Sequence, residues 1–264
     1  MPYGHFSADG REYIITEPRT PRLWHNYSWN NSFLMQMDHC GNGMCQYHDG
    51  NSEHRSKLID HRVIYIQDGA GTFCAGYMPL CIEPAQFRTR VGLGYTVIDQ
   101  SVRGLYTSWR LFVPEDLPVE IWTLTLRNSG DRQRIRIFPG VHFALNTFSI
   151  PVLPHEMLID AVFDPSTNAI WAQNKSPHRP DNTYAAFFSS SLKVRGFDVA
   201  WHAVHNLWDN DKFLRDGCSN NTGGDLGPTV GYMEHELELE AGQEVTWHYL
   251  VGLRENDVDA AELT

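Results

Sequence analysis

At 264 residues, the chain is long enough to bury a substantial core in one large domain or two small ones, and its apolar runs are too short for a membrane-spanning helix. Its formal net charge of −11, with histidine neutral, argues against nucleic acids and anionic membranes as partners. Five sparsely placed cysteines and a start that lacks a signal-peptide pattern lead us to expect a cytoplasmic protein with reduced thiols.

Nearly all the regular structure that the sequence predicts is β-strand. A hairpin-type turn at Asp9 and Gly10 comes first, an extended segment rich in tryptophan and tyrosine follows at 18–31, and short strands return at 33–66. The clearest hairpin turns at residues 68–71. In chain order, the strands with clear limits are predicted at 3–6, 13–16, 63–67, 72–75, 119–128, 132–138, 141–145, 157–163, 169–173, 234–240 and 245–251.

Residues 87–145 show the strongest β pattern and predict at least four consecutive antiparallel strands. Side chains alternate with period two, which is typical of a strand packed on one side and solvated on the other. The side chains predicted to point inward are Trp122, Leu124, Leu126, Ile135 and Ile137. Arg134 and Arg136 are predicted to point outward, so the stretch indicates a large antiparallel sheet domain.

The last third of the chain is less regular at first and then returns to strands. Prolines interrupt residues 146–183, and a short helix is predicted at 210–215, followed by a glycine-rich loop. Two closing strands are joined by a turn at 241–244. The tail at 254–264 has the character of a helix start, with Asn256 as a candidate cap, and suggests a longer parent chain.

Cysteine and histidine gather in one short segment, with two further histidines nearby. They are His39, Cys40, Cys45, His48, His54 and His61. A zinc site needs three or four such ligands converging tetrahedrally. On a strand, Cys45 and His48 would point to opposite faces, which is poor for chelation. The spacing therefore favours buried thiols and surface histidines, and no metal ligand is predicted.

Thirteen histidines suggest acid–base catalysis as a second kind of site. Those in or near predicted strands are His142, His202, His205, His235 and His248. No Ser-His-Asp order and no HExxH motif accompanies them, and histidines inside a sandwich are more often structural. No catalytic residue is predicted, although a mutarotase-like or metal-dependent small enzyme on the sheet face stays an alternative.

Tryptophan is abundant and raises the question of sugar binding, because exposed aromatic rings stack on pyranose rings. The candidates are Trp24, Trp29, Trp122, Trp171, Trp201 and Trp208. Alternation places Trp122 and Trp247 in the core. Trp24 and Trp29 lie in an irregular segment, so core packing and sugar binding both stay open for them.

Many short segments, in order along nearly the whole chain, resemble the cellobiose and chitobiose phosphorylase family, glycoside hydrolase family 94. The matching segments are residues 3–6, 11–16, 20–21, 24–27, 43–49, 65–68, 91–96, 112–114, 120–122, 218–220, 241–244 and 250–252. The chain departs from the family pattern in two places. The aromatic-rich GYSFY-like strand is GMCQY here, and the loop after Asn146 is proline-rich.

The resemblance implies an all-β fold, a large antiparallel supersandwich of the galactose-mutarotase-like kind. It would occupy residues 1–253, and 254–264 would begin a helical linker to an (α/α)6 barrel. The implied function is that of the non-catalytic N-terminal domain of an inverting, phosphate-dependent disaccharide phosphorylase. In that family the catalytic acid and the phosphate-binding groups belong to the barrel. We therefore expect this chain alone to be inactive and to need no cofactor, with inorganic phosphate as the co-substrate of the parent enzyme.

The resemblance also implies partners. They are a β-linked disaccharide or oligosaccharide, the catalytic barrel in cis or in trans, and a second copy in a homodimer, with no nucleic acid and no membrane. A family loop after the strand that corresponds to 141–146 approaches the partner's sugar site, so Asn146 and Phe148 are the candidate substrate-binding residues. A free-standing carbohydrate-binding or accessory sandwich stays open as an alternative function.

Overall fold

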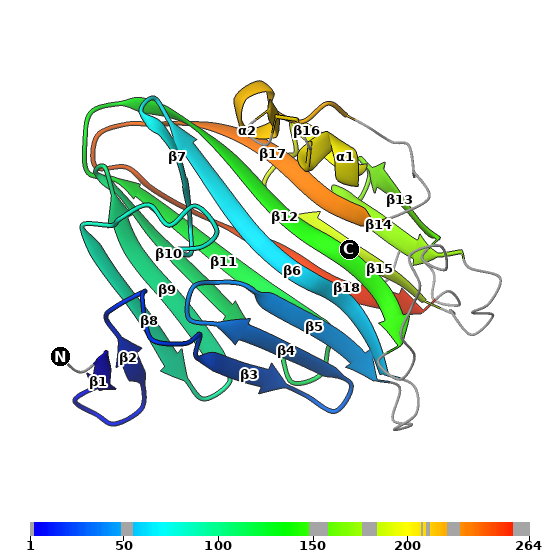
Figure 1. Ribbon diagram of the computed structural model, residues 1–264, viewed down its shortest axis with the longest axis horizontal. Helices are drawn as coiled ribbons and strands as arrows, with labels where there is room; N and C mark the ends of the chain where they lie inside the picture. Colours follow the sequence, from blue (N-terminus) through cyan, green and yellow to red (C-terminus); the bar gives the residue numbers. More distant parts are fainter. Residues whose placement is uncertain are drawn as a thin grey trace.

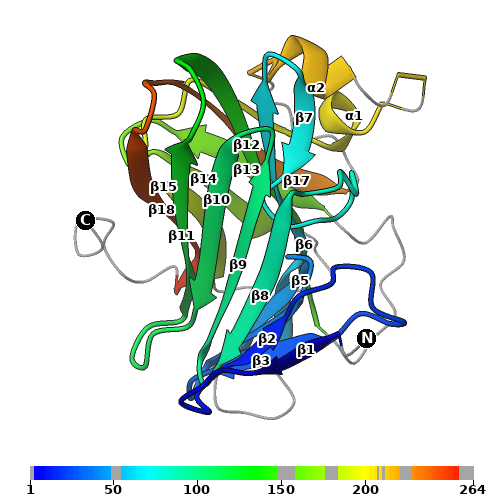
Figure 2. The ribbon, with the colours of Figure 1, turned by 90° about the vertical axis from the view of Figure 1, so that its left-hand side faces the viewer.

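The computed structural model describes residues 3–48, 55–147, 158–175, 184–206, 208–209, 212–220 and 228–255. Two antiparallel sheets pack face to face, and two short helices lie against the outer side of one of them (Figure 1, Figure 2). The predicted all-β sandwich is therefore confirmed. In the described part of the chain, no helix is both long enough and apolar enough to cross a bilayer.

One sheet of the described chain has ten strands. In spatial order they are β1 (Gly4–Phe6), β2 (Tyr13–Ile15), β8 (Gln86–Gly92), β9 (Tyr95–Val102), β10 (Leu105–Phe112), β11 (Val119–Asn128), β18 (Glu244–Glu255), β15 (Tyr184–Ser190), β14 (Ala169–Asn174) and β13 (Ile159–Asp164). The predicted consecutive strands of residues 87–145 supply β8 to β11, which pair in chain order, whereas the crossover from β11 to β18 joins distant parts of the sequence.

The other sheet has eight strands in the described chain. In spatial order they are β16 (Gly196–Ala200), β17 (Thr229–Leu239), β12 (Gln133–Thr147), β6 (Arg55–Asp68), β5 (Gly43–His48), β4 (Phe33–Asp38) and β3 (His25–Trp29), and β7 (Gly71–Cys74) pairs with β6 outside this path. The helices are α1 (Trp201–Val204) and α2 (Lys212–Asp216). The predicted hairpin at 68–71 is confirmed by the pairing of β6 with β7.

The core lies between the sheets and is built from the alternate residues that the sequence predicts to point inward. Trp122, Leu124, Leu126, Ile135 and Ile137 are all fully buried. Trp109 and Trp122 pack edge to face at the centre, with ring centroids 5.4 Å apart. Each aromatic ring removes a large apolar area from water, so this face supplies much of the stabilisation of the sandwich.

A second, smaller apolar cluster lies on the outer face of the eight-stranded sheet, beneath the helices. Its buried members are Val63, Cys74, Phe138, Val204, Phe213, Val230 and Tyr232. Phe213 of α2 packs on Phe138 and Tyr232, with ring centroids 5.1 and 5.2 Å away. A Cβ on Gly140 would meet the Tyr232 ring at 2.2 Å, so glycine is required there for the ring to lie across β12.

The structure differs from the sequence prediction at three places. The two strands predicted on either side of Pro139 are one strand, β12, whose pairing with β17 is interrupted between Ile137 and Gly140. His202 and His205 were predicted to lie in or near strands, but residues 201–204 form the helix α1, and Trp201 and His205 pack on His142 of β12. The strand β18 continues to Glu255, and the predicted linker helix lies outside the described residues.

Candidate functional site

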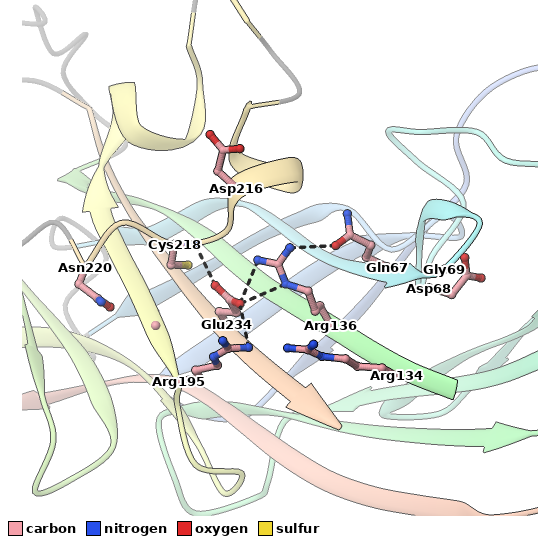
Figure 3. Close-up of a pocket in the computed structure, with 11 residues that line it drawn as sticks. Gln67, Asp68, Gly69, Arg134, Arg136, Arg195, Asp216, Cys218, Asn220 and Glu234 are labelled. Carbon is pink, nitrogen blue, oxygen red and sulfur yellow. Dashed lines mark hydrogen bonds and ion pairs between the residues drawn. The ribbon is translucent and has the colours of Figure 1, made fainter. Parts of the chain in front are cut away.

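A polar pocket of about 630 Å³ opens on the outer face of the eight-stranded sheet, beside α2 (Figure 3). We call it the arginine pocket, after Arg134, Arg136 and Arg195, which line it together with Glu234. Strands β6, β12 and β17, the residues before β16 and the loop after α2 contribute its walls. The site is therefore assembled from segments that lie far apart in the sequence.

Strand alternation explains why these charges face the pocket. On β12 the side chains of Ile135 and Ile137 point into the core, so those of Arg134 and Arg136 point outward, as predicted. On β17 the acidic residues stand opposite them, since Arg136 pairs in register with Glu236. Opposite charges on neighbouring strands stabilise the pairing, and here they also supply the chemistry of the pocket.

Glu234 is the most constrained group in the pocket, with a side chain only 7% exposed. Its Oε1 accepts hydrogen bonds from Nε and Nη2 of Arg136, at 3.2 and 3.0 Å, and its Oε2 accepts one from the backbone N–H of Cys218 at 2.9 Å. Arg136 also donates from Nη1 to Oε1 of Gln67 at 3.0 Å. Both carboxylate oxygens are thus occupied by donors, so neither is placed to give a proton to a ligand.

The loop after α2 is held against the pocket by buried carboxylates. Gly217 has φ of +88°, and a Cβ there would meet Arg136 Nη2 at 2.2 Å, so only glycine allows this close approach. Ser219 donates from its backbone N–H and its hydroxyl to Asp198, at 2.9 and 2.6 Å. Burial raises the pKa of the Cys218 thiol well above its ordinary value, which makes it a poor nucleophile. The loop therefore has a structural role rather than a catalytic one.

Three histidines meet at the other end of the same outer face. His61 of β6 and His142 of β12 are cross-strand neighbours with ring centroids 4.5 Å apart. Nε2 of His142 lies 3.1 Å from Nε2 of His205, and the Trp201 ring lies 4.1 Å from the His205 ring, centroid to centroid. Burial lowers the pKa of His61 to about 4 and that of His142 to about 2. These imidazoles are neutral at pH 7 and are engaged with one another.

The other histidines considered for acid–base chemistry lie elsewhere. His235 is fully buried in the sandwich, and its Nδ1–H donates to the Lys193 carbonyl at 2.9 Å. His248 lies on the exposed face of the ten-stranded sheet, with Nδ1 3.1 Å from the Thr123 hydroxyl. The structure thus brings the candidates His142 and His205 together and adds His61, whereas His202 is exposed on α1.

The residues considered for zinc lie in separate environments. Nε2–H of His39 donates a hydrogen bond to the Pro18 carbonyl at 2.9 Å, and Nδ1 accepts one from the backbone N–H of Trp24. The imidazole therefore holds the N-terminal segment in place. Burial raises the pKa of Cys40 to about 12. Cys45 is buried in the core, and His54 lies outside the described residues. Within the described ranges, no group of three or more His, Cys, Asp or Glu is placed to hold a metal ion.

Of the residues predicted to contact substrate, Asn146 lies at the opposite end of β12 from Arg134 and Arg136. Asn146 is near the end of that strand, opposite Lys57 of β6, and Phe148 lies outside the described residues. The arginine pocket is not among the sites that the sequence predicted. One signal for it was present, since arginines alternate on 132–138 and glutamates on 234–240, which indicates two charged strands side by side.

Some of the tryptophans are buried and others are exposed, according to their positions in the fold. Trp122 and Trp247 are buried, as predicted. Trp24 packs against the rings of Tyr3 and Tyr13, with centroids 6.1 Å away from each, so it is part of the N-terminal cluster. Trp29 and Trp208 are exposed, at 69% and 95%.

Comparisons with known proteins agree on one family. Residues 11–264 match the family model described as "Glycosyl hydrolase 94, supersandwich domain". The solabiose phosphorylase of Paenibacillus borealis is 31% identical over 99% of this chain and 36% of its own length. The N,N'-diacetylchitobiose phosphorylase of Vibrio proteolyticus is 23% identical over 96% of this chain and 34% of its own length. The chain thus spans about a third of the curated relatives that it matches.

Solved structures resemble the chain in fold. A bacterial glucoamylase complexed with acarbose superposes with a TM-score of 0.57 and 6% identity, over 96% of this chain and 36% of that one. A galactose mutarotase-like protein from Lactobacillus casei gives a TM-score of 0.50 and 9% identity, over 88% of this chain and all of that one. At such identities the likeness concerns the sandwich fold alone.

Proposed function

This chain belongs to the glycosyl hydrolase 94 supersandwich domain family, and from that premise we propose that it is the non-catalytic N-terminal domain of an inverting, phosphate-dependent disaccharide phosphorylase. Relatives that match nearly all of this chain are phosphorylases of solabiose and of N,N'-diacetylchitobiose. We propose a β-linked disaccharide as the substrate of the whole protein, inorganic phosphate as its co-substrate, no cofactor, and the cytoplasm as its location.

The non-catalytic role is supported by the hydrogen bonds and ion pairs that the carboxylates Glu234 and Asp68 make in the arginine pocket. An inverting phosphorylase needs a carboxylic acid that protonates the leaving oxygen. Glu234 is occupied by Arg136 and Cys218, and Asp68 is paired with Arg103 at 2.9 Å. Both oxygens of each carboxylate already accept hydrogen bonds, so neither carboxyl group is placed to protonate a leaving oxygen. The catalytic acid is therefore expected in another part of the whole protein.

An apolar band on the ten-stranded sheet supports a role in dimerisation. Five outward positions lie in one row across β11, β18, β15, β14 and β13, namely Val119, Gly252, Phe187, Trp171 and Val162. Gly252 lets its neighbours close over it, since a Cβ there would meet Val119 Cγ1 at 2.5 Å. Apolar rows on a solvated sheet face are typical of protein interfaces, so we propose that a second copy packs on this band.

The substrate entrance belongs to the same proposal. Asn146, near the end of β12, and Phe148 stay the residues that we propose near the sugar of a partner subunit. The second candidate function is a free-standing carbohydrate-binding sandwich. The exposed indole of Trp29 favours it, because it lies beside a small hollow where an aromatic face can stack on a sugar ring.

The proposal predicts the size of the native protein. An antibody raised against this domain should detect, in extracts of the source cells under denaturing conditions, a polypeptide more than twice the 30.2 kDa of this chain. This follows because the chain spans about a third of its relatives. A single polypeptide of this chain's own mass would reject the phosphorylase proposal and favour the free-standing sandwich.

A further inference from the structure

A second hollow, apart from the arginine pocket, lies beside β3. This strand forms one edge of the eight-stranded sheet (Figure 1). It measures about 180 Å³ and opens beside the indole of Trp29. The side chains of Leu34, Gln46 and His48 line it together with the turn between β3 and β4. We call it the Trp29 hollow.

Alternation along β3 places the aromatic rings on the solvent side. Ser28 is buried, whereas Tyr27 and Trp29 on either side of it are 47% and 69% exposed. Trp29 stands directly opposite Leu34 on β4, and Leu34 stands opposite Gln46 on β5. An indole, an aliphatic side chain and a carboxamide therefore form one row across three strands.

The turn that carries Trp29 is fixed by Asn30. Its Oδ1 accepts hydrogen bonds from the N–H groups of Ser32 and Phe33, at 2.9 and 2.8 Å. Its Nδ2 donates to the carbonyls of Pro114 and Leu117, both at 2.8 Å. Two of these bonds close the turn and two join it to the loop between β10 and β11, so the backbone beneath the indole is held in place before any ligand arrives.

We propose that the Trp29 hollow binds one pyranose ring of a neutral carbohydrate. The flat indole offers its face to the C–H groups of the ring, and the Gln46 amide and the His48 imidazole offer hydrogen bonds to its hydroxyls. Among the residues that the structure describes, no arginine, lysine, aspartate or glutamate lines the hollow, which sets it apart from the arginine pocket and disfavours an anionic ligand. Its volume suits a single hexose, so affinity is expected to be weak.

The choice of β-linked glucosides as the sugar class rests on the proposed function. The evidence that the hollow is a sugar site comes from its own residues and does not depend on that function. The test therefore uses this chain with two neutral probes, cellobiose and N,N'-diacetylchitobiose, and measures binding by calorimetric titration and by saturation-transfer NMR. Wild type is expected to bind at least one of them saturably. Trp29→Ala should weaken that binding at least about 10-fold, through loss of the stacking surface.

Two variants act as controls. Trp208→Ala removes an even more exposed indole that does not line the hollow and should bind sugar within about twofold of wild type. Trp29→Tyr keeps an aromatic face and should retain most of the affinity. Thermal unfolding of each variant separates lost binding from lost folding.

Three results would overturn the proposal. They are the absence of saturable binding to either probe by wild type, equal affinities of Trp29→Ala and wild type, and a change of assembly mass in Trp29→Ala by light scattering, which would make the hollow a subunit contact. None of them bears on phosphorolysis, which is measured separately with the native protein.

Discussion

Replacing Glu120 with alanine should lower the free energy of unfolding by about 3–5 kcal/mol, among the largest effects of any single change in this domain. Glu120 of β11 and Arg62 of β6 form an ion pair between the two sheets, and both side chains are 0% exposed. Arg62 donates from Nε to Oε1 at 3.1 Å and from Nη2 to Oε2 at 2.8 Å, and the Trp122 N–H also donates to Oε1 at 2.8 Å. The alanine variant would leave a guanidinium in the core without its counter-charge.

Urea denaturation of matched variants measures this effect. Glu238→Ala is the control, because Glu238 pairs with Arg132 on the surface, where both side chains are 61% exposed, and its loss should cost less than about 1 kcal/mol. The double variant Arg62→Met, Glu120→Leu should recover most of the stability, since apolar residues of similar volume can replace a buried pair. Equal losses in Glu120→Ala and Glu238→Ala would contradict the assigned role of the inter-sheet pair.

Stability should also fall steeply as the pH drops from 6.5 to 5, by about 2 kcal/mol for each of two buried histidines. Burial lowers the pKa of His61 and of His235 to about 4 in the folded chain, against 6.5 when unfolded. The unfolded chain therefore takes up protons below pH 6.5 that the folded chain does not. The stabilisation is complete above pH 6.5 and is lost as the pH falls toward 4.

The slope of unfolding free energy against pH provides the readout. His61→Gln and His235→Gln should each flatten the slope between pH 6.5 and 5, whatever their effect at pH 7, and comparison with wild type removes the contribution of the carboxylates. His25→Gln, which changes an exposed imidazole in the same way, is the control for the substitution itself. An unaltered slope in both buried-site variants would show that these histidines titrate normally in the folded chain.

The inner face of the sandwich could be predicted from local pattern alone. Alternation in residues 119–128 predicted the buried positions of Trp122, Leu124 and Leu126, and the same parity places Glu120 inside. Its partner could not be found in this way, because Arg62 lies 58 residues away in the chain. Pairing across sheets depends on topology, which local periodicity does not encode.

The candidate site, too, could be predicted from the sequence only in part. The outward direction of Arg136 followed from its strand, but its bond to Glu234 joins residues 98 apart. The short helix α1 could not be predicted, since packing of its Trp201 on His142 overrides the β propensity of the preceding residues. Trp29 was left open between core and surface, because the sequence around it lacks a clear period, and the structure places it outside.

Phosphorolysis by the native protein and by this chain alone shows whether the domain is non-catalytic. The native protein from its source cells and this 264-residue chain are each incubated with inorganic phosphate and a panel of β-linked disaccharides, and the sugar 1-phosphate formed is quantified. We expect the native protein to form sugar 1-phosphate from at least one disaccharide and the folded chain alone to form none. Sugar 1-phosphate released by the chain alone, or by neither protein from any disaccharide, would contradict the assignment as a non-catalytic phosphorylase domain.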